Sequence, residues 1–240
     1  MTVPRVVAHR GSSGRHPDNS WAAFRAAVTE GADAIECDVV ATRDNVLVVR
    51  HDFVVGDRLV ADIDAAELEG IEPQTPRFAD VVAWAARTGV DLLVEVKDPD
   101  AMDAVGDTVH ASPWREHIVV AGFHGPALAA LKRARPDVRT SFMMGSVVGA
   151  DDLVHLATAC RADGVHPCWD GRAPRPHRLL DAGVVGRLRD AGLTVTLWHE
   201  EREDELRALV ALRPDAICTN TPATLRAIVD RASDPRGGIT

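Results

Sequence analysis

The sequence predicts a single α/β domain folded as a (β/α)8 TIM barrel. Eight short apolar runs recur along the 240 residues, about 30 residues apart, which is the length of a strand with its following helix. Their apolar character on both faces is typical of a parallel sheet covered by helices. A doubly wound open sheet is the structural alternative. The runs lie at residues 3–8, 34–40, 90–96, 117–121, 138–144, 164–168, 193–198 and 215–218.

Glycine and capping residues mark where the helices between these runs end and begin. Four glycines lie at the junctions between predicted helices and apolar runs, and they predict left-handed positions just past a helix. Capping side chains are expected before three helices. The glycines are Gly31, Gly89, Gly164 and Gly192. The expected helix starts are Pro17-Asp18-Asn19-Ser20, Asp151-Asp152 and Thr219-Asn220-Thr221-Pro222.

One irregular region interrupts the regular alternation after the second predicted strand. Asp44-Asn45 is typical of a tight turn, so residues 46–50 are expected to fold back as a short antiparallel strand. Residues 52–76 then form a short insertion, with a helical turn near residues 64–68. No low-complexity linker divides the chain. We therefore expect one barrel domain over residues 1–232 and a loose C-terminal tail over 233–240.

Composition excludes several classes of function. A net charge of −9 and a pI near 5.5 argue against a nucleic-acid binder, which usually carries a basic patch. The first apolar run starts at Val3, and no apolar stretch approaches the roughly 20 residues of a membrane span. We expect a cytoplasmic protein without membrane insertion, of open oligomeric state. Its four cysteines lack C-x-x-C spacing and are expected to be buried thiols.

Ionisable side chains follow the apolar runs at the same end, where TIM barrels carry their active groups. Glu36 and Asp38 are two residues apart in a strand, so they share one face, and two buried like charges repel each other. A divalent cation relieves that repulsion. Glu95 on the next strand completes an oxygen-ligand set that suits Mg²⁺ or Ca²⁺ equally. The alternative is that these carboxylates only pair with Arg or Lys.

The neighbouring side chains suggest phosphate chemistry at this edge. Arg10 and Lys97 beside an anion-rich metal site predict a phosphate group as ligand, unless they only form salt bridges to the carboxylates. His9 and His51 are candidates for proton transfer near neutral pH. Phe123 follows one strand and is expected to line a pocket wall. Trp198 is expected to do the same, with core packing as the alternative for both. His166, His199 and Glu200 also lie near strand ends, and we expect mainly structural roles for them.

Six ordered motifs resemble those of the glycerophosphodiester phosphodiesterase family, which belongs to the phospholipase C-like phosphodiesterases. A weaker resemblance extends over the rest of the chain, through Gly122-Phe123, Trp198 and residues 215–222. The six motifs are His9-Arg10-Gly11, Pro17-Asp18-Asn19-Ser20, residues 31–39, Thr42-Arg43-Asp44, residues 48–52 and Glu95-Val96-Lys97.

The resemblance implies a metal-dependent hydrolase of lipid and glycerol metabolism. Its substrates would be small glycerophosphodiesters, and its products glycerol 3-phosphate and an alcohol. One divalent cation would be held by the three carboxylates. His9 would act as base and His51 as acid, while Arg10 and Lys97 contact phosphate. The short insertion leaves an open mouth, so lysophospholipase D-type activity on lysophospholipids is an alternative.

Three departures from the family pattern flank the predicted site. Pro-Glu-Asn-Thr becomes Pro17-Asp18-Asn19-Ser20, Trp-Thr-Val-Asn becomes Trp198-His199-Glu200-Glu201, and Thr-Asp becomes Thr219-Asn220. They put substrate choice in question more than activity. Two other functional hypotheses are compatible with these residues. One is a barrel lyase or Schiff-base aldolase that uses Lys97; the other is a non-catalytic binder of phosphorylated ligands.

Overall fold

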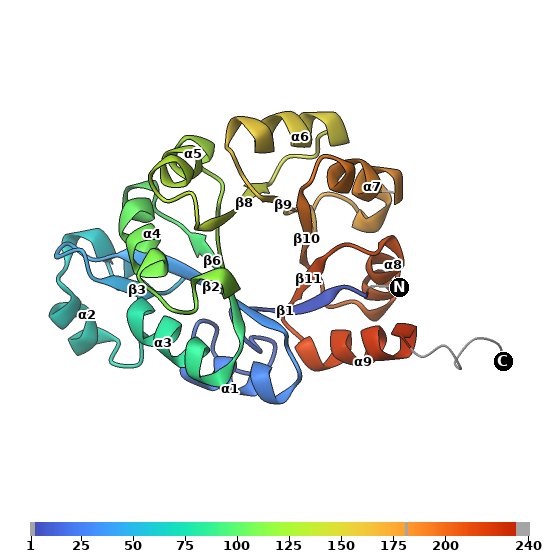
Figure 1. Ribbon diagram of the computed structural model, residues 1–240. Helices are drawn as coiled ribbons and strands as arrows, with labels where there is room; N and C mark the ends of the chain where they lie inside the picture. Colours follow the sequence, from blue (N-terminus) through green and yellow to red (C-terminus); the bar gives the residue numbers. More distant parts are fainter. Residues whose placement is uncertain (1–2, 181, 234–240) are drawn as a thin grey trace.

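The computed structural model describes residues 3–180 and 182–233 and shows a closed barrel of eight parallel strands surrounded by helices (Figure 1). The ring closes because β1 pairs with both β2 and β11. This confirms the predicted TIM barrel, and each of the eight apolar runs forms one barrel strand. The barrel strands are β1 (Arg5–His9), β2 (Ala34–Ala41), β6 (Asp91–Val96), β7 (Ile118–Gly122), β8 (Arg139–Met144), β9 (Gly164–Pro167), β10 (Thr194–His199) and β11 (Ala216–Thr219).

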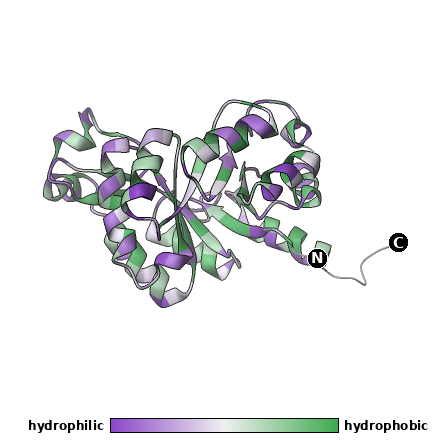
Figure 2. Ribbon diagram, turned by 45° about the horizontal axis from the view of Figure 1, so that its top comes forward, coloured by the Kyte–Doolittle hydropathy of each residue, from purple (hydrophilic) through white to green (hydrophobic). Residues whose placement is uncertain are grey.

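Helices follow the strands and cover the outside of the ring (Figure 1). Figure 2 shows why, since the central strands are largely hydrophobic while the helices alternate between hydrophobic and hydrophilic residues. Among the described residues, no helix has the length and hydropathy needed to cross a membrane. The outer α-helices are α1 (Trp21–Thr29), α3 (Phe78–Thr88), α4 (Met102–His110), α5 (Gly125–Ala134), α6 (Ala150–Ala159), α7 (Ala182–Asp190), α8 (Glu203–Leu212) and α9 (Pro222–Ser233). Short 3-10 turns are η1 (Val60–Asp62), η2 (Pro99–Ala101), η3 (Arg115–His117) and η4 (Pro176–Leu179).

The main hydrophobic core lies between the strands and the helices. On β2, Ile35, Cys37 and Val39 pack in the same cluster as Phe24 of α1 and Phe78 of α3. Strand side chains alternate, so the residues between them face the inside of the barrel. The barrel interior is therefore where Glu36 and Asp38 must lie.

The insertion after β2 has more structure than the sequence predicts. Strand β3 (Leu47–Val49) pairs antiparallel with β2, as expected. A small hairpin of β4 (Val54–Val55) and β5 (Arg58–Leu59) follows, and then α2 (Ala65–Ile71). The segment has its own small apolar cluster, formed by Val40, Val48, Val55, Val60, Ile63 and Leu68.

The division of the chain at residue 232 stays a prediction. Ser233 is the last residue of α9, and residues 234–240, most of the predicted tail, lie outside the described residues.

The helix ends confirm most of the predicted signals. Gly31, Gly89 and Gly192 have φ values of 82°, 74° and 80°, the left-handed conformation that glycine adopts easily. The expectation for Gly164 is wrong, because Arg161 takes the left-handed position after α6 (φ 56°) and Gly164 lies inside β9. Glycine is required at position 164 because a Cβ there would lie 2.8 Å from the carbonyl oxygen of Thr194 and overlap the hydroxyl of that residue.

The helix starts follow a similar pattern. The side chain of Ser20 caps α1, as expected. Pro222 opens α9, as expected. The expectation for α6 is shifted, because this helix begins at Ala150 with Gly149 at its N-cap. Asp151 and Asp152 therefore lie in the first turn, where acidic side chains favour the helix dipole.

We predict that Gly164→Ala lowers the free energy of unfolding by about 1–3 kcal/mol, because the added methyl group overpacks the contact between β9 and β10. Gly186→Ala is the matched control, since no heavy atom lies within 4 Å of a Cβ built on this residue of α7. That change should be stabilising by about 0.5–1 kcal/mol. Urea denaturation measures both, and equal effects would contradict the packing account.

Candidate active site

Three carboxylates meet inside the barrel at the carboxyl ends of β2 and β6. Glu36 and Asp38 project from β2, and the parallel pairing places Asp38 directly beside Glu95 of β6. One oxygen from each lies within 4.8 Å of the others. All three residues are buried, at 2%, 0% and 7% exposure. The structure thus brings together the three predicted metal ligands.

The electrostatics of this cluster favour a bound cation. Burial raises the pKa of Glu36 well above its usual value, and the charges of Asp38 and Glu95 raise it further. Burial and the charge of Asp38 also raise the pKa of Glu95. Glu36 Oε1 and Asp38 Oδ1 have no hydrogen-bond partner within the described part of the chain. Hard oxygen donors with free lone pairs suit Mg²⁺ or Ca²⁺, so these residues fit a divalent metal.

Hydrogen bonds from two loops orient the carboxylates. Asn19 donates to Asp38 Oδ2 (2.8 Å) and accepts from the Asp38 N–H (3.2 Å). The Arg10 N–H donates to Glu36 Oε2 at 2.9 Å. Arg10 reaches this position with φ 55°, and the next residue, Gly11, has φ 83° and packs tightly on Ala23 of α1. The tight turn after β1 thereby aims a backbone donor at the cluster.

The two predicted phosphate-binding cations also lie against the carboxylates. Arg10 Nε is 3.1 Å from Asp38 Oδ2. Lys97 Nζ is 2.8 Å from Glu95 Oε1 and 3.7 Å from Asp38 Oδ1. The salt-bridge alternative therefore describes the contacts seen. Both cations remain close enough to the cluster to meet a phosphate held there.

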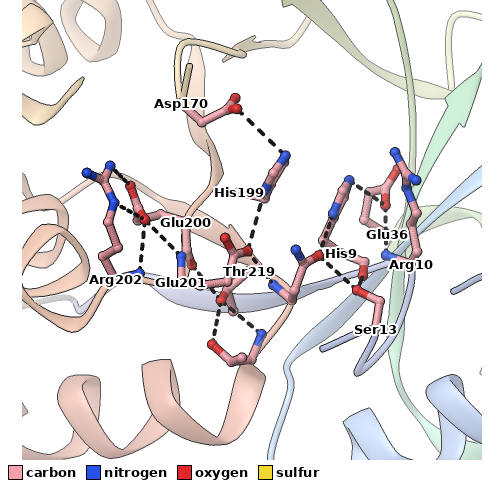
Figure 3. Close-up of polar contacts among 12 residues, drawn as sticks. His9, Arg10, Ser13, Glu36, Asp170, His199, Glu200, Glu201, Arg202 and Thr219 are labelled. Carbon is pink, nitrogen blue, oxygen red and sulfur yellow. Dashed lines mark hydrogen bonds and ion pairs between the residues drawn. The ribbon is translucent and has the colours of Figure 1, made fainter. Parts of the chain in front are cut away.

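His9 lies beside the cluster at the end of β1 (Figure 3). Its Nδ1 is 2.7 Å from Asn220 Oδ1, and its Nε2 is 3.9 Å from Glu36 Oε2. An amide oxygen can only accept a hydrogen bond, so Nδ1 carries the ring proton and Nε2 presents a lone pair. Burial lowers the pKa of His9 well below its usual value, and the charges of His199 and Arg10 lower it further. Burial thus favours the neutral form of His9, whose Nε2 is available to accept a proton.

His51 lies in the loop after β3. Its Nδ1 is 2.7 Å from Asp52 Oδ1, and its side chain is 38% exposed. The hydrogen bond lowers the pKa of Asp52, so a carboxylate faces this ring. His51 lines one pocket together with Asp18 and Asn19, and Asn19 is the residue that hydrogen-bonds Asp38.

The remaining candidate residues differ in exposure: one lies at the open end of the barrel and the others are buried. Phe123 is half exposed just after β7. Trp198 is buried and stacks on Trp169 in the hydrophobic core, with ring centroids 6.3 Å apart. His166 is buried, which lowers its pKa to about 4. Glu200 is buried and paired with Arg202.

Sequence reasoning assigned no role in the site to three side chains that contact His9 or the carboxylates. Asn19 and Asn220 are within quoted motifs, but the sequence assigns neither of them a partner. His199 was expected to be structural, and its ring stacks directly on His9. The only sequence signal was its place at a strand end.

Comparisons with known proteins identify the family of this chain. Residues 9–224 match the model of the glycerophosphoryl diester phosphodiesterase family. The chain belongs to this family. A glycerophosphodiester phosphodiesterase from Caldanaerobacter subterraneus subsp. tengcongensis is 24% identical over 245 residues, covering 93% of this chain and 97% of that protein.

Two solved structures share the fold of this family member. A glycerophosphodiester phosphodiesterase from Thermotoga maritima has a TM-score of 0.80 at 18% identity, covering 95% of this chain and 99% of that one. A phosphodiesterase from Oleispira antarctica, solved with its product sn-glycerol-3-phosphate, has a TM-score of 0.81 at 22% identity, covering 95% and 97%. They confirm the barrel expected of a phosphodiesterase of this family.

We predict that Asn19→Gly weakens Mg²⁺ binding by roughly 10- to 100-fold, because Asp38 loses its two hydrogen bonds with Asn19. Glycine keeps the positive φ of 51° accessible. Asn45→Gly is the control, since Asn45 has a similar φ of 58° in the turn after β2. Calorimetric titration of the metal-free variants measures the change, and unaltered affinity in Asn19→Gly would refute the orienting role.

Proposed function

We propose that this phosphodiesterase hydrolyses glycerophosphodiesters to glycerol 3-phosphate and an alcohol with the help of one divalent cation. The observation that carries the proposal is the buried trio Glu36, Asp38 and Glu95, whose oxygens converge beside His9 and include two without a hydrogen-bond partner among the described residues. A protein that only binds phosphorylated ligands has no need for such a trio of carboxylates. Mg²⁺ and Ca²⁺ both remain candidates, and the cytoplasmic location stays a prediction.

The chain's own residues would bind and orient the diester. The three carboxylates would hold the cation, which when bound supplies Lewis-acid polarisation of a phosphoryl oxygen. Arg10 and Lys97 would turn from their carboxylate partners toward the phosphate and offset its negative charge. Phe123 is proposed to contact the organic part of the substrate at the mouth. A similar contact for Trp198 stays a prediction, and its burial favours the core-packing alternative.

The two histidines have complementary surroundings for proton transfer. Nε2 of neutral His9 would take the proton of the attacking hydroxyl, either water or the glycerol hydroxyl of the substrate. A P–O bond forms to that oxygen, and the P–O bond to the alcohol breaks. Nε2 of His51 would deliver a proton to the departing oxygen, with Asp52 as counter-charge. If the glycerol hydroxyl attacks, a cyclic phosphate results; water would then form a P–O bond, the ring P–O bond would break, and the proton of the water would pass to the released glycerol oxygen, which gives net hydrolysis.

The other functional hypotheses have less support. Imine chemistry on Lys97 needs a free amine, and Lys97 Nζ is engaged by two carboxylates. A non-catalytic binder would need an incomplete site, and each predicted ligand and histidine is present.

We predict that His9→Ala and His51→Ala each lower kcat on glycerophosphocholine by about 10²-fold or more, because each removes a proton-transfer group. EDTA should abolish turnover, and Mg²⁺ or Ca²⁺ should restore it. His117→Ala, at the opposite end of the barrel, is the control. The assay is release of glycerol 3-phosphate, and full activity of His51→Ala would remove that residue from the mechanism.

A lysophospholipid is a second candidate substrate, and an apolar groove beside the site favours it. A groove of about 300 Å³ runs from Lys97 to the β4–β5 hairpin. Phe53 and Leu59 of the hairpin region are 47% and 49% exposed, so they offer apolar surface next to the proposed phosphate site. An acyl chain could lie there. The groove is lined by Val40, Ala41, Phe53, Leu59, Val60, Ala61, Lys97, Asp98 and Pro99.

If the groove holds an acyl chain, Leu59→Ser should raise KM for a lysophosphatidylcholine by roughly 5- to 10-fold, because apolar contact is lost. KM for glycerophosphocholine should stay unchanged. Ile71→Ser is the matched control, since Ile71 is also 49% exposed but lies outside the groove. A KM for lysophosphatidylcholine that stays at the native value in Leu59→Ser would argue against this second candidate.

A further inference from the structure

The ring of His9 is restrained on three sides. Asn220 holds Nδ1, and Glu36 faces Nε2. The third restraint is His199, which stacks face to face on His9 with centroids 4.4 Å apart and planes 8° apart. A hydrogen bond at one nitrogen leaves an imidazole free to rock about that bond. A flat partner against its face removes this freedom.

His199 reaches this position because of an irregularity in β10. The pairing of β10 with β11 shifts between Leu197 and His199, so one extra residue, Trp198, lies in the strand. Leu197 and Trp198 both join the hydrophobic cluster that also holds Val195. The bulge therefore turns His199 inward, where regular alternation would have placed Trp198.

His199 is itself clamped by two carboxylates (Figure 3). Its Nδ1 is 3.4 Å from Glu201 Oε1, and its Nε2 is 3.8 Å from Asp170 Oδ2. The same Glu201 oxygen accepts the backbone N–H of Asn220 at 3.2 Å. One carboxylate thus ties together the two residues that hold His9. Two of the departures from the family pattern, at 198–201 and 219–220, meet in this clamp.

We propose that His199 is a positioning residue for the hydrolysis, which sets the plane of the His9 ring so that Nε2 meets the attacking hydroxyl. The proposal rests on the proposed acid–base role of His9. His199 does not touch the reacting atoms and acts only through its neighbour. Misplacement of a catalytic group by about 1 Å can lower a rate by 10²-fold, so loss of the stack should be visible in kcat.

The kinetic test separates the ring from its charge. His199→Ala removes the stacking partner, and kcat should fall by roughly 10- to 100-fold while KM changes by less than about threefold. His199→Phe keeps a flat ring without ionisable nitrogens and should recover kcat to within about threefold of the native chain. His117→Ala is the matched control, because His117 also stacks on a ring, that of Trp114 (3.8 Å, 14°), and pairs with a carboxylate, Asp91. It lies at the opposite end of the barrel and should have native kcat.

A spectroscopic readout keeps the test valid if the alanine variant folds poorly. In the native chain, the Nδ1–H of His9 is held by Asn220 and should give a slowly exchanging imidazole NH signal in ¹⁵N-edited NMR. The signal should persist in His199→Phe. Glu201→Gln, which loosens the clamp without altering either ring, should broaden it and lower kcat by a few fold.

The outcomes distinguish this proposal from the proposed function. Native kcat in His199→Ala, or His199→Phe as impaired as His199→Ala, would overturn the positioning role. If His9→Ala retained full activity, the assigned role of His9 would fail first. Loss of activity in His9→Ala together with native behaviour in His199→Ala would refute only the role of His199.

Discussion

Mutual repulsion among three buried carboxylates is the constraint on which the site depends. Glu36, Asp38 and Glu95 bring oxygens within 4.8 Å of one another, and all three residues are buried. Such a cluster persists only if other groups supply positive charge or hydrogen bonds. Lys97 and the turn at Arg10 provide part of this, and the oxygens left without partners indicate where a cation would complete it.

The carboxylates and the groups around them come from different parts of the barrel. Adjacent parallel strands fix the ligands at one end, because Asp38 and Glu95 are in direct register. Strand ends and loops add the candidate acid–base histidines, and each of these is held by a nearby polar partner. In this chain the partner of His9 is the neutral amide of Asn220, while the nearby carboxylates Glu201 and Asp170 are engaged with His199. These two carboxylates thus contact His199 and not the ring of His9 itself.

Much of the fold and of the ligand set could be read from local patterns. The eight strands follow from apolar runs, since a parallel strand covered on both faces must be apolar on both. Glu36 and Asp38 share a face because a strand repeats every two residues. The space available to a side chain cannot be predicted from such local patterns, because it depends on neighbouring strands that are distant in sequence. Gly164 was therefore expected just past a helix, whereas the structure requires glycine there because Thr194 of the neighbouring strand β10 leaves no room for a side chain.

The sequence by itself determined the barrel, the carboxylate trio and the two histidines, because those features depend on short-range periodicity and on the shared end of parallel strands. Only the tertiary structure decided which side chains of β10 face the site. A single extra residue reverses strand alternation, so Trp198 packs in the core and His199 meets His9. A bulge of this kind arises from pairing with a neighbouring strand and leaves no periodic signal in the sequence.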